Sequence, residues 1–335
     1  MGLTTEDLRA KVGTFITEYA GCPVEIERFE RLTGGAIQEN WALDLTVSAG
    51  EWAGRHELVL RRDSQSTVAA SHGRRDEFDL LKVAHEAGVT VPQPCFCCDD
   101  PEVIGGPFFI MHRVEGVAAG FRLVKAGPDP DLANQLGRDL ARIHSIRPPR
   151  DDLAFLGPAP DHPARETVAR FRHYLDGLSA PHPVLEWGLD WLKRNAPDAE
   201  EVVLCHRDYR TGNYMAADGR LTGVLDWEFA GWSDPLEDIG WFFAKCWRFG
   251  AWDRDAGGIA GREDFLSAYE AESGRQVDRD AIPYWEVMAH VHWAVVACQQ
   301  AERHVSGEEP SLELALTAHV VPELELEILS MTREG

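Results

Sequence analysis

Alternating apolar and polar residues near the start of the chain predict a small β-sheet. The alternation over 24–29 leads into turn residues that include Gly34 and Gly35, and a second apolar stretch covers 40–47. This spacing predicts a hairpin whose tip contains glycine. A third strand is expected over 57–61, where a cation follows the last apolar residue.

One helix is expected to accompany this sheet, over 73–86. Glu77 lies early in that helix, its apolar residues recur at helical spacing, and Gly88 ends it. A further short, buried strand is expected over 107–111. These signals predict an N-terminal lobe within residues 1–112 that holds a small antiparallel sheet of five strands and one helix.

The pattern becomes helical in the second third of the chain. Leu132, Leu136 and Leu140 recur every four residues and therefore share one helical face. We expect an α+β chain in which a larger, mainly helical lobe fills 113–335 and includes a small β element within 202–226. Further helical stretches are expected at 167–175, 185–194, 262–271, 282–303 and 312–329.

The charge of the chain excludes one class of partner. Its 335 residues include 33 Lys and Arg against 56 Asp and Glu, a formal net charge of −23. A nucleic-acid binder needs a basic stripe that displaces counterions, and a chain this acidic with scattered arginines cannot easily present one. We therefore expect no nucleic-acid partner. The sequence leaves the oligomeric state open.

Targeting and cysteine signals indicate a reducing compartment. The first residues lack a basic segment followed by an apolar run, and no stretch approaches the roughly 20 apolar residues of a membrane span. A cytoplasmic protein without a membrane partner is therefore expected. The seven cysteines are an odd number, which suits free thiols. Cys95, Cys97 and Cys98 cluster, but no second ligand pair at matching spacing supports a structural zinc.

The most informative stretch surrounds the dipeptide Asp218-Gly219, which favours a two-residue hairpin turn. Counting outward from this turn places Asp226 opposite Thr211. Asn213 and Asp226 would then emerge at the same end of the hairpin, about 7–8 Å apart by backbone.

These side chains suit phosphoryl transfer. Asn213 and Asp226 offer a neutral and an anionic oxygen, which are ligands for a Mg²⁺ that also bridges phosphates. Asp208 could accept a proton from an incoming hydroxyl. Two other interpretations stay open: loop side chains that cap turns, and a metallohydrolase with His206, Asp208, Asp226 and Glu228 around a metal. No further histidine pair at ligand spacing supports the hydrolase.

Three motifs resemble the signature of a known family. The chain carries His206-Arg207-Asp208 with Asn213, then Asp226-Trp227-Glu228, then Asp-Pro-Leu-Glu-Asp-Ile-Gly at 234–240. In type and order they resemble the aminoglycoside and choline kinase-like phosphotransferases, over nearly the whole chain. The resemblance implies the bilobal protein-kinase-like fold. The residues around Tyr209-Arg210 and Asp226 are most similar to the branch associated with acyl-CoA dehydrogenases.

The resemblance implies roles for residues of the larger lobe. Asp208 would be the catalytic base, Asn213 and Asp226 would bind Mg²⁺, and Glu228 would assist a second metal. Asp238, on the following helix, would anchor the loop that carries Asp208. His206 would then be structural.

It also implies an ATP site in the smaller lobe. The backbone of Gly34 and Gly35 would cover the phosphates, and the backbone around His112 and Val114 would bind adenine. Glu77 would hold the cation that contacts the phosphates. That cation is the one departure from the family, because Arg61 stands where lysine is common. A guanidinium can still hold phosphate bidentately and pair with Glu77.

The acceptor is less defined by the sequence. Tryptophans gather after the metal motif, and packing is expected to explain at least half of them. Acidic residues among aromatics would suit a cationic acceptor such as an amino sugar or a choline-like alcohol, whereas aromatic walls with few polar groups would suit a hydroxyacyl compound. The tryptophans are Trp227, Trp232, Trp241, Trp247, Trp252, Trp285 and Trp293.

The sequence therefore predicts an ATP- and Mg²⁺-dependent kinase that transfers the γ-phosphate to a small-molecule hydroxyl. The rival hypothesis is a nucleotide-binding pseudokinase with a regulatory role, which arginine at position 61 would explain.

Overall fold

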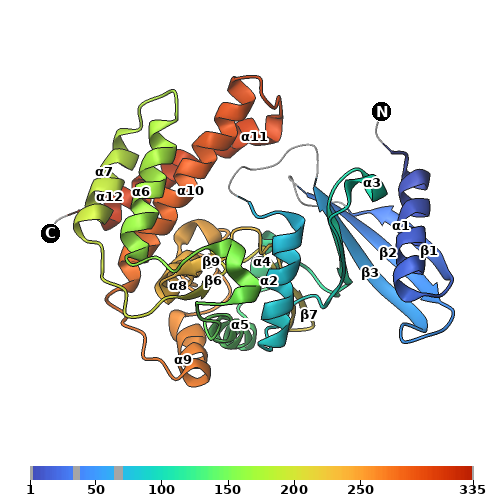
Figure 1. The fold of residues 1–335 in the computed structure, drawn as a ribbon. Helices are drawn as coiled ribbons and strands as arrows, with labels where there is room; N and C mark the ends of the chain where they lie inside the picture. Colours follow the sequence, from blue (N-terminus) through green and yellow to red (C-terminus); the bar gives the residue numbers. More distant parts are fainter. Residues whose placement is uncertain (1–2, 33–37, 64–70, 334–335) are drawn as a thin grey trace. The chain divides into compact units, whose positions relative to one another are not determined.

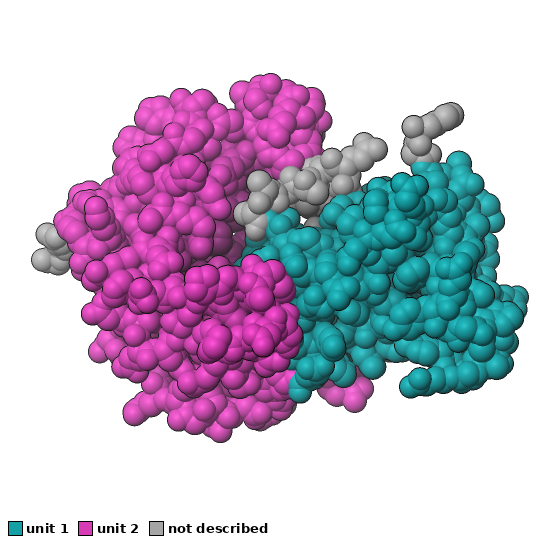
Figure 2. All heavy atoms as spheres, in the orientation of Figure 1, with its two compact units in different colours: residues 1–86, 90–115, 222–229 teal, residues 87–89, 116–221, 230–335 magenta. Residues whose placement is uncertain are grey.

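A computed structural model of the chain describes residues 3–32, 38–63 and 71–333, and in it the chain forms two compact units (Figure 1 and Figure 2). Unit 1 comprises 1–86, 90–115 and 222–229, and unit 2 comprises 87–89, 116–221 and 230–335. The segments of the two units alternate along the chain. The lobe boundary between residues 112 and 113 that the sequence suggests stays a prediction.

Unit 1 is built on one antiparallel sheet (Figure 1). The order of its strands is β1-β2-β3-β5-β4, so β3 is central and pairs with β2 on one side and β5 on the other. This sheet confirms the five strands expected for the first lobe. The strands are β1 (Val24–Arg31), β2 (Gln38–Val47), β3 (Gly54–Asp63), β4 (Pro94–Cys98) and β5 (Phe108–His112).

The helices of unit 1 differ from the expectation of one. The expected helix is α2 (Arg74–Glu86), but α1 (Thr5–Ala20) and the short α3 (Pro101–Ile104) accompany it. A capping box begins α1: the Thr4 hydroxyl accepts from the Asp7 N–H, and the Asp7 carboxylate accepts from the Thr4 N–H. Leu8, Val12 and Ile16 recur every four residues on α1 and enter the core that covers one face of the sheet.

The central strand places a cation on the other face of the sheet. Leu58 and Leu60 of β3 belong to the core shared with α1, and alternation along a strand turns Arg61 to the opposite face. There Arg61 lies between Asn40 of β2 and Phe109 of β5, and only 6% of it is exposed. The position of the cation follows from the register of the strands.

Unit 2 is mainly helical, and one of its hydrophobic cores joins α6, α7, α10 and α12. The stretch expected as one helix over 312–329 is divided into α11 and α12, with a 3₁₀ turn between them. None of the helices in the described part of the chain is both long and apolar enough to cross a bilayer. The α-helices are α4 (Gly120–Lys125), α5 (Pro130–Ile143), α6 (Pro163–Asp176), α7 (Pro183–Arg194), α8 (Pro235–Phe243), α9 (Arg262–Ser273), α10 (Ile282–Val305), α11 (Leu312–Thr317) and α12 (Val321–Met331).

Two small β elements interrupt these helices. Strand β6 (Val203–Cys205) pairs with β9 (Gly231–Ser233), and β7 (Tyr214–Ala217) forms a hairpin with β8 (Arg220–Val224). The turn of this hairpin has positive φ at both central residues, 51° at Asp218 and 72° at Gly219. These angles confirm the two-residue turn expected from Asp-Gly.

Close packing fixes α8 against α10. A Cβ atom added at Gly240 of α8 would lie 2.4 Å from the Cβ of Trp285 and 2.7 Å from its carbonyl carbon. Only glycine permits this approach. Helix α8 follows β9 directly, so its position also sets the position of the loop that follows β6.

We expect Gly240→Ala to lower the free energy of unfolding by about 1–3 kcal/mol or more, because the added methyl overpacks a rigid helix contact. The matched control is Gly106→Ala, where φ is ordinary and an added Cβ meets no atom within 4 Å. Urea unfolding of both variants tests this expectation. Equal stability of the two variants would contradict the packing argument.

Candidate functional site

The loop after β6 carries the predicted base, and a buried carboxylate from α8 holds that loop. Both oxygens of Asp238 accept backbone N–H groups, one from His206 and one from Arg207, each at 2.7 Å. Arg207 has a φ of 61°, a conformation that costs energy for a residue with a side chain. The two bonds to Asp238 maintain this turn, which agrees with the anchoring role expected from the resemblance.

Asp238 is itself held by His144 at the end of α5. The His144 Nε2 donates to Asp238 at 3.2 Å, and the Nδ1 lies 2.8 Å from the Tyr269 hydroxyl. Burial lowers the pKa of His144, so the ring is neutral and Nδ1 accepts the Tyr269 proton. Burial alone would raise the pKa of Asp238, but its hydrogen bonds to His144 and His206 keep that pKa below its usual value.

This buried group also contains Cys205, and its three side chains could in principle hold a metal ion. Their polar atoms already have other partners, however. The two Asp238 oxygens accept backbone N–H groups, and the Cys205 thiol donates to the Asp234 carbonyl at 3.3 Å. Burial raises the pKa of this thiol well above its usual value, which opposes metal binding. We interpret His144, Cys205 and Asp238 as a structural group.

Asp208 lies in the middle of this loop with several donors on its carboxylate. Its Oδ1 accepts from Arg210 Nε at 2.8 Å and from Trp241 Nε1 at 3.0 Å. Its Oδ2 accepts from Asn213 Nδ2, which also donates to the Asp208 carbonyl at 3.1 Å. The structure thus brings Asp208 and Asn213, two of the predicted site residues, into direct contact within unit 2.

The conformation of the loop depends on a second glycine. Gly212 has a φ of 113°, and a Cβ added there would lie 2.8 Å from Nη1 of Arg210. His206 is fully buried, and its Nδ1 accepts from the Asp208 N–H at 3.2 Å. Its place inside the loop agrees with the structural role expected for it.

The predicted phosphate cation lies in unit 1 with its predicted partner. Nε of Arg61 is 3.1 Å from the Glu77 carboxylate, and its Nη2 is 3.0 Å from Oδ1 of Asp226. Burial opposes the charge on the guanidinium, but Glu77 and Asp226 raise the pKa of Arg61 above its usual value. Arg61, Glu77 and Asp226 therefore form one charged cluster. The resemblance implied the pair of Arg61 and Glu77 but not the contact with Asp226.

Sequence reasoning did not find a second buried arginine in this cluster. Arg74, at the start of α2, is 1% exposed and pairs with Glu77, with Asp63 at 2.9 Å and with Glu228 at 3.8 Å. Its position three residues before Glu77 on a predicted helix was the available signal. Burial raises the pKa of Glu228 to about 7, although the charge of Arg61 opposes this shift.

The strand pairing inferred for Asp226 does not form. Strand β7 begins at Tyr214 and β8 ends at Val224, so the ladder stops before Thr211 and Asp226. Asp226 instead has a φ of 61°, which takes the chain out of the strand direction. Extrapolating the register past the last strand residues was wrong for this reason. Asp226 and Glu228 belong to unit 1, whereas Asn213 belongs to unit 2.

Of the residues expected to cover the phosphates and bind adenine, the structure describes His112 and Val114. Gly34 and Gly35 lie outside the described residues. His112 ends β5, its backbone N–H donates to the Gln93 carbonyl at 2.8 Å, and its ring stacks on Trp52. A Cβ added at Gly223 would lie 3.1 Å from Cγ2 of Val114. Their role in binding adenine stays a prediction.

The tryptophans serve mainly in packing, as expected for at least half of them. Trp252 is 54% exposed. Beside Asp208, the ring of Trp241 lies 5.3 Å from that of Trp247, and the Arg210 guanidinium lies 4.4 Å above Trp247. The buried members of the set are Trp227, Trp232, Trp241, Trp247 and Trp285.

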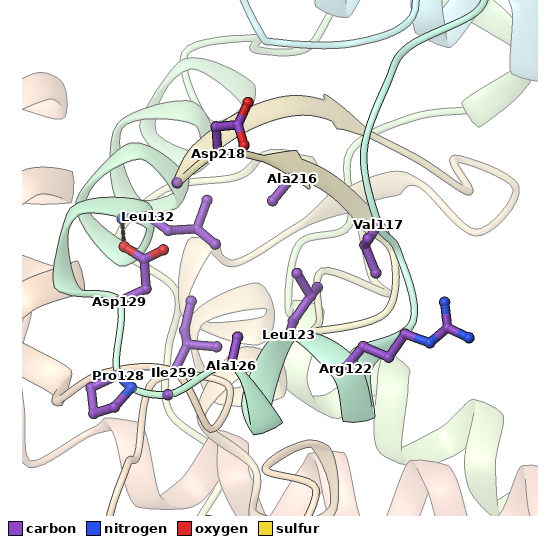
Figure 3. A pocket seen from close by; sticks show the side chains of 12 residues that line it. Val117, Arg122, Leu123, Ala126, Pro128, Asp129, Leu132, Ala216, Asp218 and Ile259 are labelled. Atoms are coloured by element: carbon purple, nitrogen blue, oxygen red, sulfur yellow. Dashed lines mark hydrogen bonds between the residues drawn. The ribbon is translucent and has the colours of Figure 1, made fainter.

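A separate cavity of about 250 Å³ lies within unit 2, between α4, the start of α5 and the turn of the β7-β8 hairpin (Figure 3). Arg122 stands at one side, and Asp129 and Asp218 at the other (Figure 3). Oδ1 of Asp129 accepts from the Leu132 N–H and thereby caps α5. The cavity is lined by none of the predicted site residues.

Comparison with known proteins assigns the class of the chain. Residues 28–280 match the Phosphotransferase enzyme family. The chain therefore belongs to this family, which confirms the resemblance seen in the motifs.

Individual similarities agree with this assignment. A putative aminoglycoside phosphotransferase from Ralstonia eutropha is 19% identical, with a TM-score of 0.74 over 97% of this chain and 98% of that chain. A spectinomycin phosphotransferase in complex with ADP and spectinomycin is 13% identical, with a TM-score of 0.63 over 96% and 98%. These neighbours confirm the bilobal, kinase-like α+β fold.

A sequence relative indicates which branch of the family the chain resembles. Acyl-CoA dehydrogenase family member 11 of Pongo abelii is 27% identical over 291 residues, which cover 81% of this chain and 37% of that protein. The chain thus spans little more than a third of the length of this relative. The similarity confirms the expected closeness to the branch associated with acyl-CoA dehydrogenases.

We expect Arg74→Met to lower the free energy of unfolding by about 3–5 kcal/mol, because it leaves buried carboxylates without their counter-charge. The neighbouring Arg75→Met is the matched control, since the Arg75 side chain is 54% exposed and pairs with Asp79 on the surface. That control should change stability by about 0.5 kcal/mol or less. Urea unfolding compares the two, and similar losses would show that the Arg74 cluster adds no stability.

Proposed function

We propose that this protein is an ATP- and Mg²⁺-dependent phosphotransferase that moves the γ-phosphate to a hydroxyl of a small molecule. One observation carries the proposal: the Asp208 carboxylate is fixed in a buried loop and is directly hydrogen-bonded to Asn213. A fixed carboxylate beside a neutral oxygen ligand is the arrangement that phosphoryl transfer to an alcohol needs.

Asp208 would act as the base. Its carboxylate accepts the proton of the acceptor hydroxyl while the hydroxyl oxygen forms a bond to the γ-phosphorus and ADP leaves with the bond electrons. The Asp208 side chain is 15% exposed. An acceptor can therefore reach it, while the surrounding loop limits its motion.

Asn213 and Asp226 would hold Mg²⁺, with Glu228 as a further carboxylate. Oxygen donors of this kind suit the ion, which would supply charge neutralisation for the phosphates. Because Asn213 commits its Nδ2 to Asp208, its amide oxygen is the atom for a metal. The Asp226 side chain keeps 36% of its surface exposed and is accessible to a ligand.

Arg61 would contact the nucleotide phosphates. Glu77 engages its Nε, which fixes the plane of the guanidinium. Its Nη2 pairs with Asp226, a contact that metal binding to Asp226 would weaken. Arginine could thus replace the family's lysine and leave a terminal N–H group for phosphate. Gly34, Gly35, His112 and Val114 remain the proposed contacts for the rest of ATP.

The acceptor would be an amino sugar, a choline-like alcohol or a hydroxyacyl compound. Two observations favour the hydroxyacyl class. Arg210 neutralises the Asp208 carboxylate at 2.8 Å, which weakens the attraction for a cationic acceptor. The sequence relatives are acyl-CoA dehydrogenase family members, which places the chain near proteins named for acyl substrates.

The second candidate function is a nucleotide-binding pseudokinase. The ion pairs of Arg61 with Glu77 and Asp226 favour it, because they already satisfy the charges that should bind phosphate and metal. Thermal shift and ATP turnover distinguish the two functions. Metal-dependent nucleotide binding without turnover across a broad acceptor panel would support the pseudokinase.

We expect Asp208→Asn to reduce phosphate transfer by about 100-fold or more while ATP still binds, since the base is lost and the nucleotide contacts are kept. Asp226→Ala should weaken the dependence of ATP binding on Mg²⁺. Asp253→Asn, an exposed carboxylate outside the site, is the control and should retain activity. Turnover of Asp208→Asn within a few-fold of the wild type would refute the assignment of the base.

An acceptor screen tests the substrate class directly. Wild-type protein with ATP and Mg²⁺ is incubated with amino sugars, cationic alcohols and hydroxyacyl thioesters, and phosphorylated products are detected by mass spectrometry. We expect a hydroxyacyl product that is absent when Mg²⁺ is chelated. A product formed only from amino sugars would contradict the preference for hydroxyacyl compounds.

A further inference from the structure

We propose that Trp241 is a positioning residue that, together with Arg210, fixes the Asp208 carboxylate so that one defined oxygen faces the acceptor. The inference rests on the proposed function, since it concerns the base of that reaction. It adds a residue that lies outside the motif of the loop, on α8, thirty-three positions along the chain.

The distribution of donors over the carboxylate carries this inference. Each carboxylate oxygen has two acceptor sites. Oδ1 of Asp208 receives Arg210 Nε at 2.8 Å and Trp241 Nε1 at 3.0 Å, so both of its sites are occupied. Oδ2 receives one donor among the described residues, from Asn213. Oδ2 is therefore the oxygen with capacity for the acceptor proton.

The indole N–H is suited to this task. It donates one hydrogen bond and cannot accept a proton, so it holds the base without competing with it. Trp241 is 5% exposed, and its ring packs against Trp247 at 5.3 Å and His292 at 4.6 Å. Burial lowers the pKa of His292 to about 3, so this neighbour stays uncharged.

Trp247 links the two donors to each other. Its ring lies beside Trp241 and also beneath the guanidinium of Arg210, at 4.4 Å. The cation-aromatic contact restricts Arg210 while its Nε bonds to Asp208. The two donors to Oδ1 are therefore supported by one aromatic ring, and the carboxylate cannot rotate without disturbing both.

The contact itself is tested without turnover. In protein labelled with ¹⁵N-tryptophan, the 11 tryptophans give 11 indole N–H signals, and Trp241→Phe identifies one by its loss. We expect Asp208→Ala to move that signal and Asp253→Ala to leave it in place. An indole signal of Trp241 that is unchanged in Asp208→Ala would overturn the proposal.

The positioning role is tested by kinetics in the holoenzyme with ATP and Mg²⁺. Trp241→Phe keeps the aromatic packing and removes the donor, so we expect kcat to fall about ten- to 100-fold, the range for losing a hydrogen bond to a charged group. KM for ATP should change less than about two-fold. Trp285→Phe is the matched control, because Trp285 is equally buried and its indole has no hydrogen-bond partner among the described residues.

The outcomes distinguish a failure of the positioning role of Trp241 from a failure of the proposed phosphotransferase function. If Trp241→Phe and Trp285→Phe lose the same fraction of kcat, Trp241 is structural and the inference is wrong. The same conclusion follows if Trp241→Phe raises KM for ATP and leaves kcat unchanged. If the wild type shows no turnover with any acceptor, the proposed function fails and the positioning role fails with it. The indole signal still decides whether Trp241 and Asp208 are in contact.

Discussion

The loop that carries Asp208 depends on one interaction, the buried carboxylate of Asp238. A buried charge is costly unless it is fully hydrogen-bonded, and Asp238 meets this condition with two backbone N–H groups and His144. The same bonds maintain the left-handed backbone at Arg207. The buried charge of Asp238 and the turn at Arg207 therefore stabilise each other, since the same two hydrogen bonds serve both.

Helix α8 contributes to the loop at two points. Asp238 holds the backbone where the loop begins, and Trp241, one turn further along α8, holds the side chain of Asp208. Residues three positions apart on a helix lie on the same face. One helical face therefore sets both the path of the loop and the direction of its carboxylate, and the close approach at Gly240 fixes that helix against α10.

The sequence predicted those features that local chemistry decides. Asp218-Gly219 allows few turns other than the one observed, and the cation Arg61 was expected directly after the last apolar residue of the third strand. Helix α1 was missed because its apolar stripe is narrow. The fifth strand was expected but not located, because prolines and cysteines obscure the alternation of β4. Trp241 acquires its role only from a tertiary contact, which spacing along the chain does not encode, whereas the spacing of Arg74 and Glu77 on one helix was a signal that the sequence reasoning did not use.

Arginine at position 61 shows why a substitution within a family motif need not be conservative. The guanidinium engages Glu77 through Nε and Asp226 through Nη2, two nitrogens of one rigid planar group. A lysine ammonium is a single point charge and would have to approach one carboxylate at the expense of the other. Arg74 supplies additional positive charge beside Glu77. The guanidinium of Arg61 therefore joins Glu77 and Asp226, and a lysine that turned to Asp226 would leave Glu77 to Arg74 and lose the link between the two carboxylates.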